Sequence, residues 1–264
     1  QRQMCIRDSI MGMNDKVERV TRDVLDDAAK KSAGDFVADV SARITIAVIA
    51  EMLGVPNSHW DKLFRWTNEI IAPQDPEFQQ GKTAQETIEG ARLELFSYFH
   101  DLAEERRRRP TGDIVSVVAN GEVRGQPLPP VELLSYYFLL VVAGNETTRN
   151  AMTGGMVALL ENPREWEKLR REPQLVDSAV EEIVRWTTPV IQFARTATED
   201  HELRGKTIRK GEAACLFYAS GNRDEEVFDD PFVFRIDRQP NPHIGFGMGA
   251  VSYTHLTLPT KRIV

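Results

Sequence analysis

The chain has 264 residues, of which 41% are hydrophobic and 28% are charged, and its formal net charge is −7. These proportions are ordinary for a globular protein with a substantial core, and the acidic balance argues against a nucleic-acid-binding protein, which usually carries a basic face. With two cysteines and no Cys-x-x-Cys pair, a zinc site and a disulfide framework are both disfavoured, and cytoplasmic localisation is expected. No apolar run approaches the roughly 20 residues that a membrane-spanning helix needs, so no membrane span is predicted.

The two ends of the chain differ in character from its body. Residues 1–9 and 251–264 resemble translated adapter or library sequence, so we expect them to be non-native and exclude them from the predicted fold. On this interpretation residues 10–250 are the native part of the protein. Natural variable tails are the alternative.

Helical periodicity dominates the first two thirds of the chain. Apolar residues recur at helical spacing, and glycine or proline marks most of the boundaries. The pattern predicts helices over 14–31, 35–53, a segment starting at Ser58, 83–108, 114–119, 130–160, 163–171 and 175–186. Residues 73–80 are expected to form a loop. The run Arg106–Arg109 is interpreted as the basic end of a helix, opposing the negative end of its dipole.

After Pro189 the sequence pattern changes from helical spacing to short strand-like segments separated by turns. Short strands are predicted at 194–198, 202–208 and 213–218, with turns at Gly205-Lys206 and Lys210-Gly211, and residues 240–249 are expected to be a loop. The fold class is therefore mainly α with a small β region.

The centre of the long 130–160 helix is unusual for a buried helix. The segment Ala143-Gly144-Asn145-Glu146-Thr147-Thr148 places a glycine, a carboxylate and two threonines where aliphatic side chains would pack best. A threonine can bond to the carbonyl one turn earlier and bend the helix, and a widened turn often marks a site. Two interpretations stay open: a groove for a flat ligand, faced by an acid and a hydroxyl, or a helix–helix crossing in which the threonine hydroxyls are satisfied.

Two further segments carry charges in suggestive places. Glu182 and Arg185 are three residues apart on a predicted helix and can pair, although surface pairs at this spacing are common. Arg195 lies at the start of a predicted strand and suits recognition of a carboxylate or phosphate, unless it is an ordinary exposed strand charge.

The last distinctive segment is the glycine-rich stretch from Asn241 to Ala250. Alternating glycines around one phenylalanine imply a loop that lies close against something. Within it, His243 could be a metal ligand, a carboxylate partner or a capped loop residue.

Taken together and in order, these four segments resemble the cytochrome P-450 family of haem-thiolate monooxygenases. Residues 143–148 are similar to its oxygen-activation motif, and Glu182 and Arg185 to its Glu-x-x-Arg pair. Phe246, Gly247 and Gly249 are similar to its haem loop. The amino-acid sequences of residues 143–150 and 241–247 are most similar to those of actinobacterial sterol and lipid side-chain hydroxylases. The resemblance covers about residues 10–250 and implies a cytochrome P-450 fold that lacks both ends.

The resemblance also implies roles for individual residues. Haem b (iron protoporphyrin IX) is the implied cofactor, a ferredoxin-type protein the implied electron donor, and a hydrophobic sterol- or lipid-like molecule the implied substrate. Glu146 and Thr147 would relay protons, and Gly144 would leave room for oxygen. Glu182 and Arg185 would be a structural pair. The implied haem contacts are Ala143, Gly144, Thr148, Arg195, His243, Ile244, Gly245, Phe246 and Gly247, with Arg195 and His243 binding the propionates. The implied substrate pocket is lined by Val142, Pro189, Val190 and Ile191.

One departure from the family pattern is severe. The family register puts a histidine at Val251 and the iron-ligating cysteine at Tyr253, so the metal ligand is missing. Cys215 lies in a predicted strand far from the loop and cannot simply replace it. We therefore expect this chain to be inactive as written. The rival interpretations are a non-catalytic truncated product and an unrelated all-α ligand-binding domain.

Overall fold

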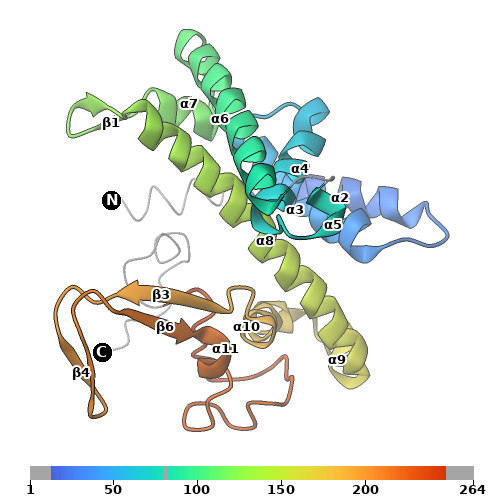
Figure 1. Ribbon diagram of the computed structural model, residues 1–264. Coiled ribbons are helices and arrows are strands. Elements are labelled where there is room, and N and C mark those ends of the chain that lie inside the picture. Colours follow the sequence, from blue (N-terminus) through green and yellow to red (C-terminus); the bar gives the residue numbers. More distant parts are fainter. Residues whose placement is uncertain (1–12, 80–82, 248–264) are drawn as a thin grey trace. The chain divides into compact units, whose positions relative to one another are not determined.

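The computed structural model describes residues 13–79 and 83–247, and the chain divides into two compact units (Figure 1). The N-terminal unit comprises Ile10–Arg149, and the C-terminal unit begins at Asn150. The long helix α8 (Pro130–Glu161) contributes residues to both units.

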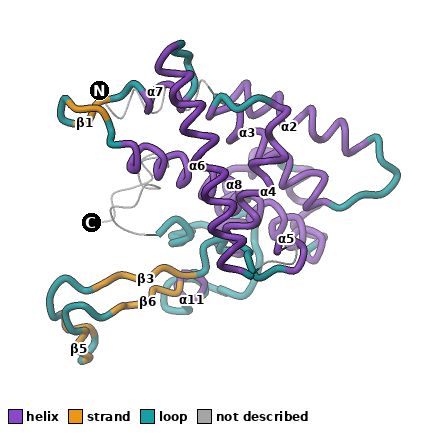
Figure 2. The backbone as a smooth tube through the Cα atoms, turned by 45° about the horizontal axis from the view of Figure 1, so that its top comes forward, coloured by secondary structure: helices purple, strands orange, loops and turns teal. Residues whose placement is uncertain are grey.

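The N-terminal unit is built almost entirely of helices (Figure 2). Besides the first part of α8, its elements are α2 (Asn14–Ala29), a π-helical turn (Val37–Ser41), α3 (Ala42–Leu53), a 3-10 turn (Asn57–His59), α4 (Trp60–Ile71), α5 (Pro76–Gln79), α6 (Ala84–Arg108), α7 (Ile114–Ala119), and the short strands β1 (Glu122–Val123) and β2 (Gln126–Pro127).

Local capping explains where several of these helices begin and end. Thr83 and Glu86 form a reciprocal capping box at the start of α6, and the Asp113 side chain accepts a hydrogen bond from the Ser116 backbone at the start of α7. Gly54 ends α3 with a positive φ of 70°, which glycine adopts without steric cost. Arg106, Arg107 and Arg108 occupy the last turn of α6, as predicted.

One apolar core holds the N-terminal unit together. Tyr137 and Val141 of α8 are fully buried in it, at the four-residue spacing that keeps side chains on one helix face. The Tyr137 hydroxyl donates to the Val115 carbonyl across 2.9 Å, and burial raises the pKa of Tyr137 to about 12. Other fully buried members of this core are Ala50, Leu53, Leu63, Leu95, Phe99 and Val115.

The C-terminal unit has a second, smaller core and the longer strands of the β region. Its elements after α8 are α9 (Pro163–Arg171), a 3-10 turn (Pro173–Leu175), α10 (Val176–Thr187), β3 (Gln192–Thr196), β4 (His201–Leu203), β5 (Lys206–Ile208), β6 (Ala213–Phe217) and α11 (Tyr218–Gly221). Strands β3 and β6 pair antiparallel, with Arg195 opposite Ala214, and β4 pairs with β5. The core of this unit is formed by Ala158, Leu159, Ala179, Phe234 and Ile236.

Glycines of α8 let α10 approach closely within the C-terminal unit. A Cβ atom added at Gly155 would lie 2.7 Å from Ile183 Cγ2, and one at Gly154 would lie 2.6 Å from Thr187 Cγ2. Both distances are shorter than a normal carbon–carbon contact, so larger residues would force the helices apart.

The prediction of a mainly α fold with a small β region is confirmed, but some boundaries are wrong. The expected loop 73–80 contains α5, whose start is held by the Asp75 carboxylate accepting from the Glu77 backbone. The segment 202–208 is a hairpin of two strands, because Arg204 and Gly205 both take positive φ. β3 begins earlier than expected and ends at Thr196, and Tyr218 starts α11 rather than ending a strand.

Candidate functional site

The Ala143–Thr148 segment lies in regular α-helix, without the widened turn that its composition suggested. The Thr147 hydroxyl donates to the Ala143 carbonyl across 2.9 Å, one turn earlier. A Cβ atom added at Gly144 would lie 3.1 Å from Ile49 Cδ1 of α3. The missing side chain of Gly144 therefore lets α8 pack against α3, and room for oxygen beside this glycine stays a prediction.

Glu146 belongs to a series of side-chain hydrogen bonds that joins α8 to α4. Its carboxylate accepts a hydrogen bond from Arg149, and both side chains are mostly buried. Arg149 Nη1 also donates to Asn68 Oδ1 across 2.9 Å. The pairing keeps the buried carboxylate compensated, which an isolated buried charge would not be.

Asn145 gave no functional signal in the sequence, yet it is the best-buried polar residue of the segment. It is fully buried, and its Oδ1 accepts from Thr45 Oγ1 at 2.7 Å while its Nδ2 donates to Thr67 Oγ1 at 2.8 Å. The partners come from α3 and α4, so this side chain connects three helices.

The helix-crossing interpretation of the segment thus accounts for Gly144 and Asn145 and for the link from Glu146 through Arg149 to α4. It also accounts for Thr147, whose hydroxyl is satisfied by the Ala143 carbonyl. A proton-relay role for Glu146 and Thr147 stays a prediction.

Glu182 and Arg185 of α10 form a doubly bonded ion pair that is completely buried. Arg185 Nε and Nη2 donate to the two Glu182 carboxylate oxygens at 2.7 and 2.8 Å, and both side chains have 0% exposure. The pair is therefore not an ordinary surface ion pair. Arg185 also donates to the carbonyls of Asn222 and Pro231, which ties the helix to the chain that follows the β region.

A second arginine, Arg238, completes this cluster and was missed in the sequence. Its Nε lies 3.1 and 3.3 Å from the two Glu182 oxygens, and the side chain is 2% exposed. It also donates to the backbone carbonyls of Asp229, Asp230 and Val233. An arginine 56 residues from its carboxylate partner gives no local signal, so spacing could not have identified it.

Arg195 lies on β3 with its side chain exposed. Its guanidinium donates to the Ala194 carbonyl and lies over the Phe193 ring, 5.7 Å from the ring centre. Among the described residues no carboxylate pairs with it. A planar cation of this kind suits a bidentate carboxylate ligand.

The start of the glycine-rich loop, residues 243–247, is anchored on the C-terminal unit at several points. The Ile244 amide donates to Asn222 Oδ1 across 2.8 Å, and the Gly247 amide closes a turn onto the Ile244 carbonyl. A Cβ atom at Gly245 would lie 2.6 Å from Val184 Cγ1, so only glycine fits against α10 here. The expectation that this loop lies close against something is met by α10 and the residues around α11.

His243 is held by the same surroundings. Its Nε2 lies 2.6 Å from Glu181 Oε2, and its Nδ1 accepts a hydrogen bond from the Gly245 amide at 3.2 Å. The histidine side chain is 4% exposed and its ring packs on Phe246. The hydrogen bond with His243 holds the pKa of the Glu181 carboxyl below its usual range, against the opposing effect of burial.

The candidate residues fall into two groups, one in each unit. Glu146 and Thr147 belong to the N-terminal unit, whereas Arg195 and the loop belong to the C-terminal unit. The predicted pocket is divided in the same way between Val142 and residues 189–191, so it stays a prediction. Among the described residues no group of three or more His, Cys, Asp or Glu side chains could hold a metal ion, and none of their helices has the length and apolar character of a membrane span.

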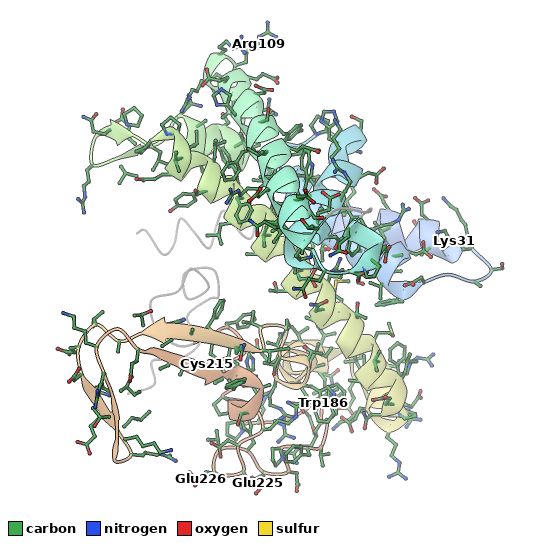
Figure 3. All side chains as sticks on the ribbon, in the orientation of Figure 1. Lys31, Arg109, Trp186, Cys215, Glu225 and Glu226 are labelled. Carbon is green, nitrogen blue, oxygen red and sulfur yellow. The ribbon has the colours of Figure 1, made fainter. Side chains whose placement is uncertain are left out.

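The expected position of the iron ligand and both of the ends expected to be non-native lie outside the described residues. Cys215, labelled in Figure 3, is exposed on β6, where its thiol lies 3.2 Å from the Gln192 side-chain oxygen. Of the parts of a haem site, the described residues offer an exposed guanidinium for a propionate and a close-packed glycine loop. This donor set fits the edge of a haem, and within the described residues it includes no iron ligand.

Comparison with known proteins adds independent findings. The sequence profile described as Cytochrome P450 matches residues 11–250. The chain is 44% identical over 241 residues to a steroid C26-monooxygenase of Mycolicibacterium smegmatis, covering 91% of this chain and 55% of that protein. It is 37% identical over 242 residues to a methyl-branched lipid omega-hydroxylase of Mycobacterium bovis, covering 91% of this chain and 56% of that protein. The chain thus spans about half the length of these relatives.

A solved structure is similar over nearly the whole chain. It is a Mycobacterium marinum cytochrome P450 in complex with pseudoionone, with a TM-score of 0.89 and 33% sequence identity. The match covers 94% of this chain and 60% of that one.

Proposed function

Because this chain belongs to the cytochrome P450 family, we propose that the whole protein to which it corresponds is a haem-dependent monooxygenase that hydroxylates a hydrophobic small molecule. The single observation that carries the proposal is the family match over residues 11–250. A ferredoxin-type protein is proposed as the electron donor, and the cytoplasm as the location.

A sterol- or lipid-like substrate is the class that the relatives favour. The similar proteins are named for a steroid and for a methyl-branched lipid. Val142, Pro189, Val190 and Ile191 are proposed to line the substrate pocket, since apolar side chains dominate sites for such molecules. Ile191 is 63% exposed in this chain, so its side chain is accessible for such a contact.

Haem b supplies the oxidising chemistry when bound, and the residues of this chain would hold it and deliver protons. Arg195 and His243 would bind the propionates with charge-assisted hydrogen bonds. Glu146 and Thr147 would deliver protons. The bond from Thr147 to the Ala143 carbonyl fixes the direction in which the hydroxyl donates, and a hydroxyl oxygen held in this way can accept a hydrogen bond as well.

The chain as written is proposed to be inactive. The family register places the cysteine ligand at position 253, where the chain has Tyr253. Cys215 contacts Gln192 on β3 and lies 28 residues before the start of the loop at His243. The alternative to an enzyme is a non-catalytic truncated product. One feature favours it, which is that Tyr253 stands where the family has its cysteine ligand.

A hybrid protein tests the proposed activity. Residues 11–247 of this chain would replace the aligned part of the M. smegmatis steroid C26-monooxygenase, whose own sequence supplies both ends. We expect the carbon monoxide difference spectrum of a thiolate-ligated haem, together with steroid hydroxylation. A hybrid that folds and binds haem but oxidises no steroid or lipid would contradict the proposed substrate class.

The same hybrid tests the role of Thr147. Replacing Thr147 with Ala should uncouple oxygen consumption from product formation, because the hydroxyl that helps deliver protons is lost. The matched control is Ser135→Ala, which removes the same kind of hydroxyl bond, from Ser135 to the Val131 carbonyl, in an exposed part of the same helix. Unchanged coupling in the Thr147 variant would remove this residue from the proton relay.

A further inference from the structure

The fully buried side chain of Asn222, the residue that follows α11, bonds to two segments that are far apart in the sequence. Its Nδ2 donates to Thr188 Oγ1 across 2.9 Å, and its Oδ1 accepts from the Ile244 amide across 2.8 Å. Thr188 directly precedes the proposed substrate-lining residues 189–191, and Ile244 belongs to the glycine-rich loop. One buried amide therefore joins these two segments within the C-terminal unit.

We propose that Asn222 is a positioning residue, which holds the substrate-lining segment and the glycine-rich loop in a fixed relation to each other. In the whole protein it would set the place of the substrate against the haem, acting through Thr188 and Ile244. For this relation to substrate and haem, the proposal rests on the proposed function.

The direction of each hydrogen bond around Asn222 is determined by its partners. The Ile244 amide can only donate, so the amide oxygen of Asn222 accepts from it and the amide nitrogen faces Thr188. The Thr188 hydroxyl accepts from that nitrogen and donates to the Arg185 carbonyl across 2.8 Å. Arg185 Nη1 in turn donates to the Asn222 carbonyl across 2.8 Å, so the network closes on itself and restricts all three residues.

The backbone of Thr188 has a conformation that threonine rarely adopts. Its φ of 42° and ψ of 67° lie in the left-handed region, which is costly for a β-branched residue. Such a conformation persists only where the surrounding contacts fix it. The two hydrogen bonds of the Thr188 hydroxyl provide this fixation, so the turn into Pro189 depends on the bond from Asn222.

The short helix α11, which directly follows β6, supports the same connection through the backbone (Figure 1). The Tyr218 amide donates to the Ile191 carbonyl across 2.9 Å. A Cβ atom added at Gly221 would lie 2.6 Å from Ile244 Cδ1, so the loop packs directly on α11. Both ends of the substrate-lining segment, Thr188 and Ile191, are therefore held by α11 and the residue after it.

The first test uses the full chain, without haem, and measures hydrogen exchange at the Ile244 amide by NMR of nitrogen-15-labelled protein. Thr188→Val removes the hydroxyl that accepts from Asn222. Exchange at Ile244 should become at least about twofold faster, because residues in one hydrogen-bond network are energetically coupled. Thr188→Ser keeps a hydroxyl at this position and should restore slow exchange.

A neighbouring threonine separates this coupling from general destabilisation. Thr187→Val removes a hydroxyl bond of the same kind, from Thr187 to the Ile183 carbonyl at 2.7 Å, and should leave Ile244 exchange unchanged. In an Asn222→Ala background, Thr188→Val should add nothing. Unchanged exchange in Thr188→Val, or an equal effect of Thr187→Val, overturns the proposal, and these two variants decide it even where Asn222→Ala fails to fold.

The hybrid enzyme tests the consequence for substrate placement. The Thr188 side chain is buried, so Thr188→Val alters the position of the segment rather than an exposed contact surface. The dissociation constant of the steroid, measured by titration of the haem spectrum, should rise about two- to tenfold. The carbon monoxide difference spectrum should stay the same. An unchanged dissociation constant would refute the link to substrate placement. Failure of the hybrid itself would contradict the proposed function and leave the exchange results without haem unaffected.

Discussion

At the scale of single residues, Arg238 helps to compensate the buried negative charge of Glu182. Glu182 faces two arginines, a backbone amide and an asparagine side chain, so its charge is compensated on several sides. Removing one cation from a buried ion cluster leaves the remaining charges unbalanced. We predict that Arg238→Ala lowers the free energy of unfolding by about 3–5 kcal/mol, measured by urea denaturation.

A surface ion pair gives the matched comparison for that prediction. The Arg170 side chain is 70% exposed and lies 3.8 Å from the Glu167 carboxylate. Replacing Arg170 with Ala should change the free energy of unfolding by less than about 0.5 kcal/mol, because water already solvates the charge. Equal effects of the two substitutions would mean that burial of Arg238 does not determine its contribution.

At the scale of helices, Asn145 connects α3, α4 and α8 through two buried hydrogen bonds. We predict that Asn145→Ala destabilises the chain by about 1–3 kcal/mol, since both threonine partners lose a buried bond. Thr45→Val removes the hydroxyl that donates to Asn145 and leaves the buried Asn145 side-chain oxygen without this donor. Because Thr45 and Asn145 share a hydrogen bond, the double variant should cost less than the sum of the single variants, as a double-mutant cycle in urea would show. Strict additivity would contradict the coupling.

Features that depend on residues close together in the sequence could be predicted, whereas contacts between residues far apart in the sequence could not. The strongly apolar run from Leu133 to Val142 is a local feature of the sequence, so the long helix was predicted to within a residue. Glu182 and Arg185 were paired correctly because they are three residues apart. Asn145 and Arg238 were missed because their partners are 56 to 100 residues away. Local spacing carries no information on such contacts.

At the scale of the whole chain, α8 runs through two units that have different cores. The core of the N-terminal unit is built around several fully buried large side chains, including Phe99 and Tyr137, whereas that of the C-terminal unit contains few. Stability rises with the apolar area buried on folding. The N-terminal unit should therefore be the more stable of the two.

This difference predicts two unfolding transitions within one continuous helix. In hydrogen exchange followed by mass spectrometry at increasing urea, amides near Val141 should stay protected at concentrations where those near Ala158 already exchange. Residues of α10 should lose protection together with Ala158, and residues of α6 together with Val141, because each belongs to the same core. A single common midpoint for both ends of α8 would show instead that the chain unfolds as one cooperative body, despite its two cores.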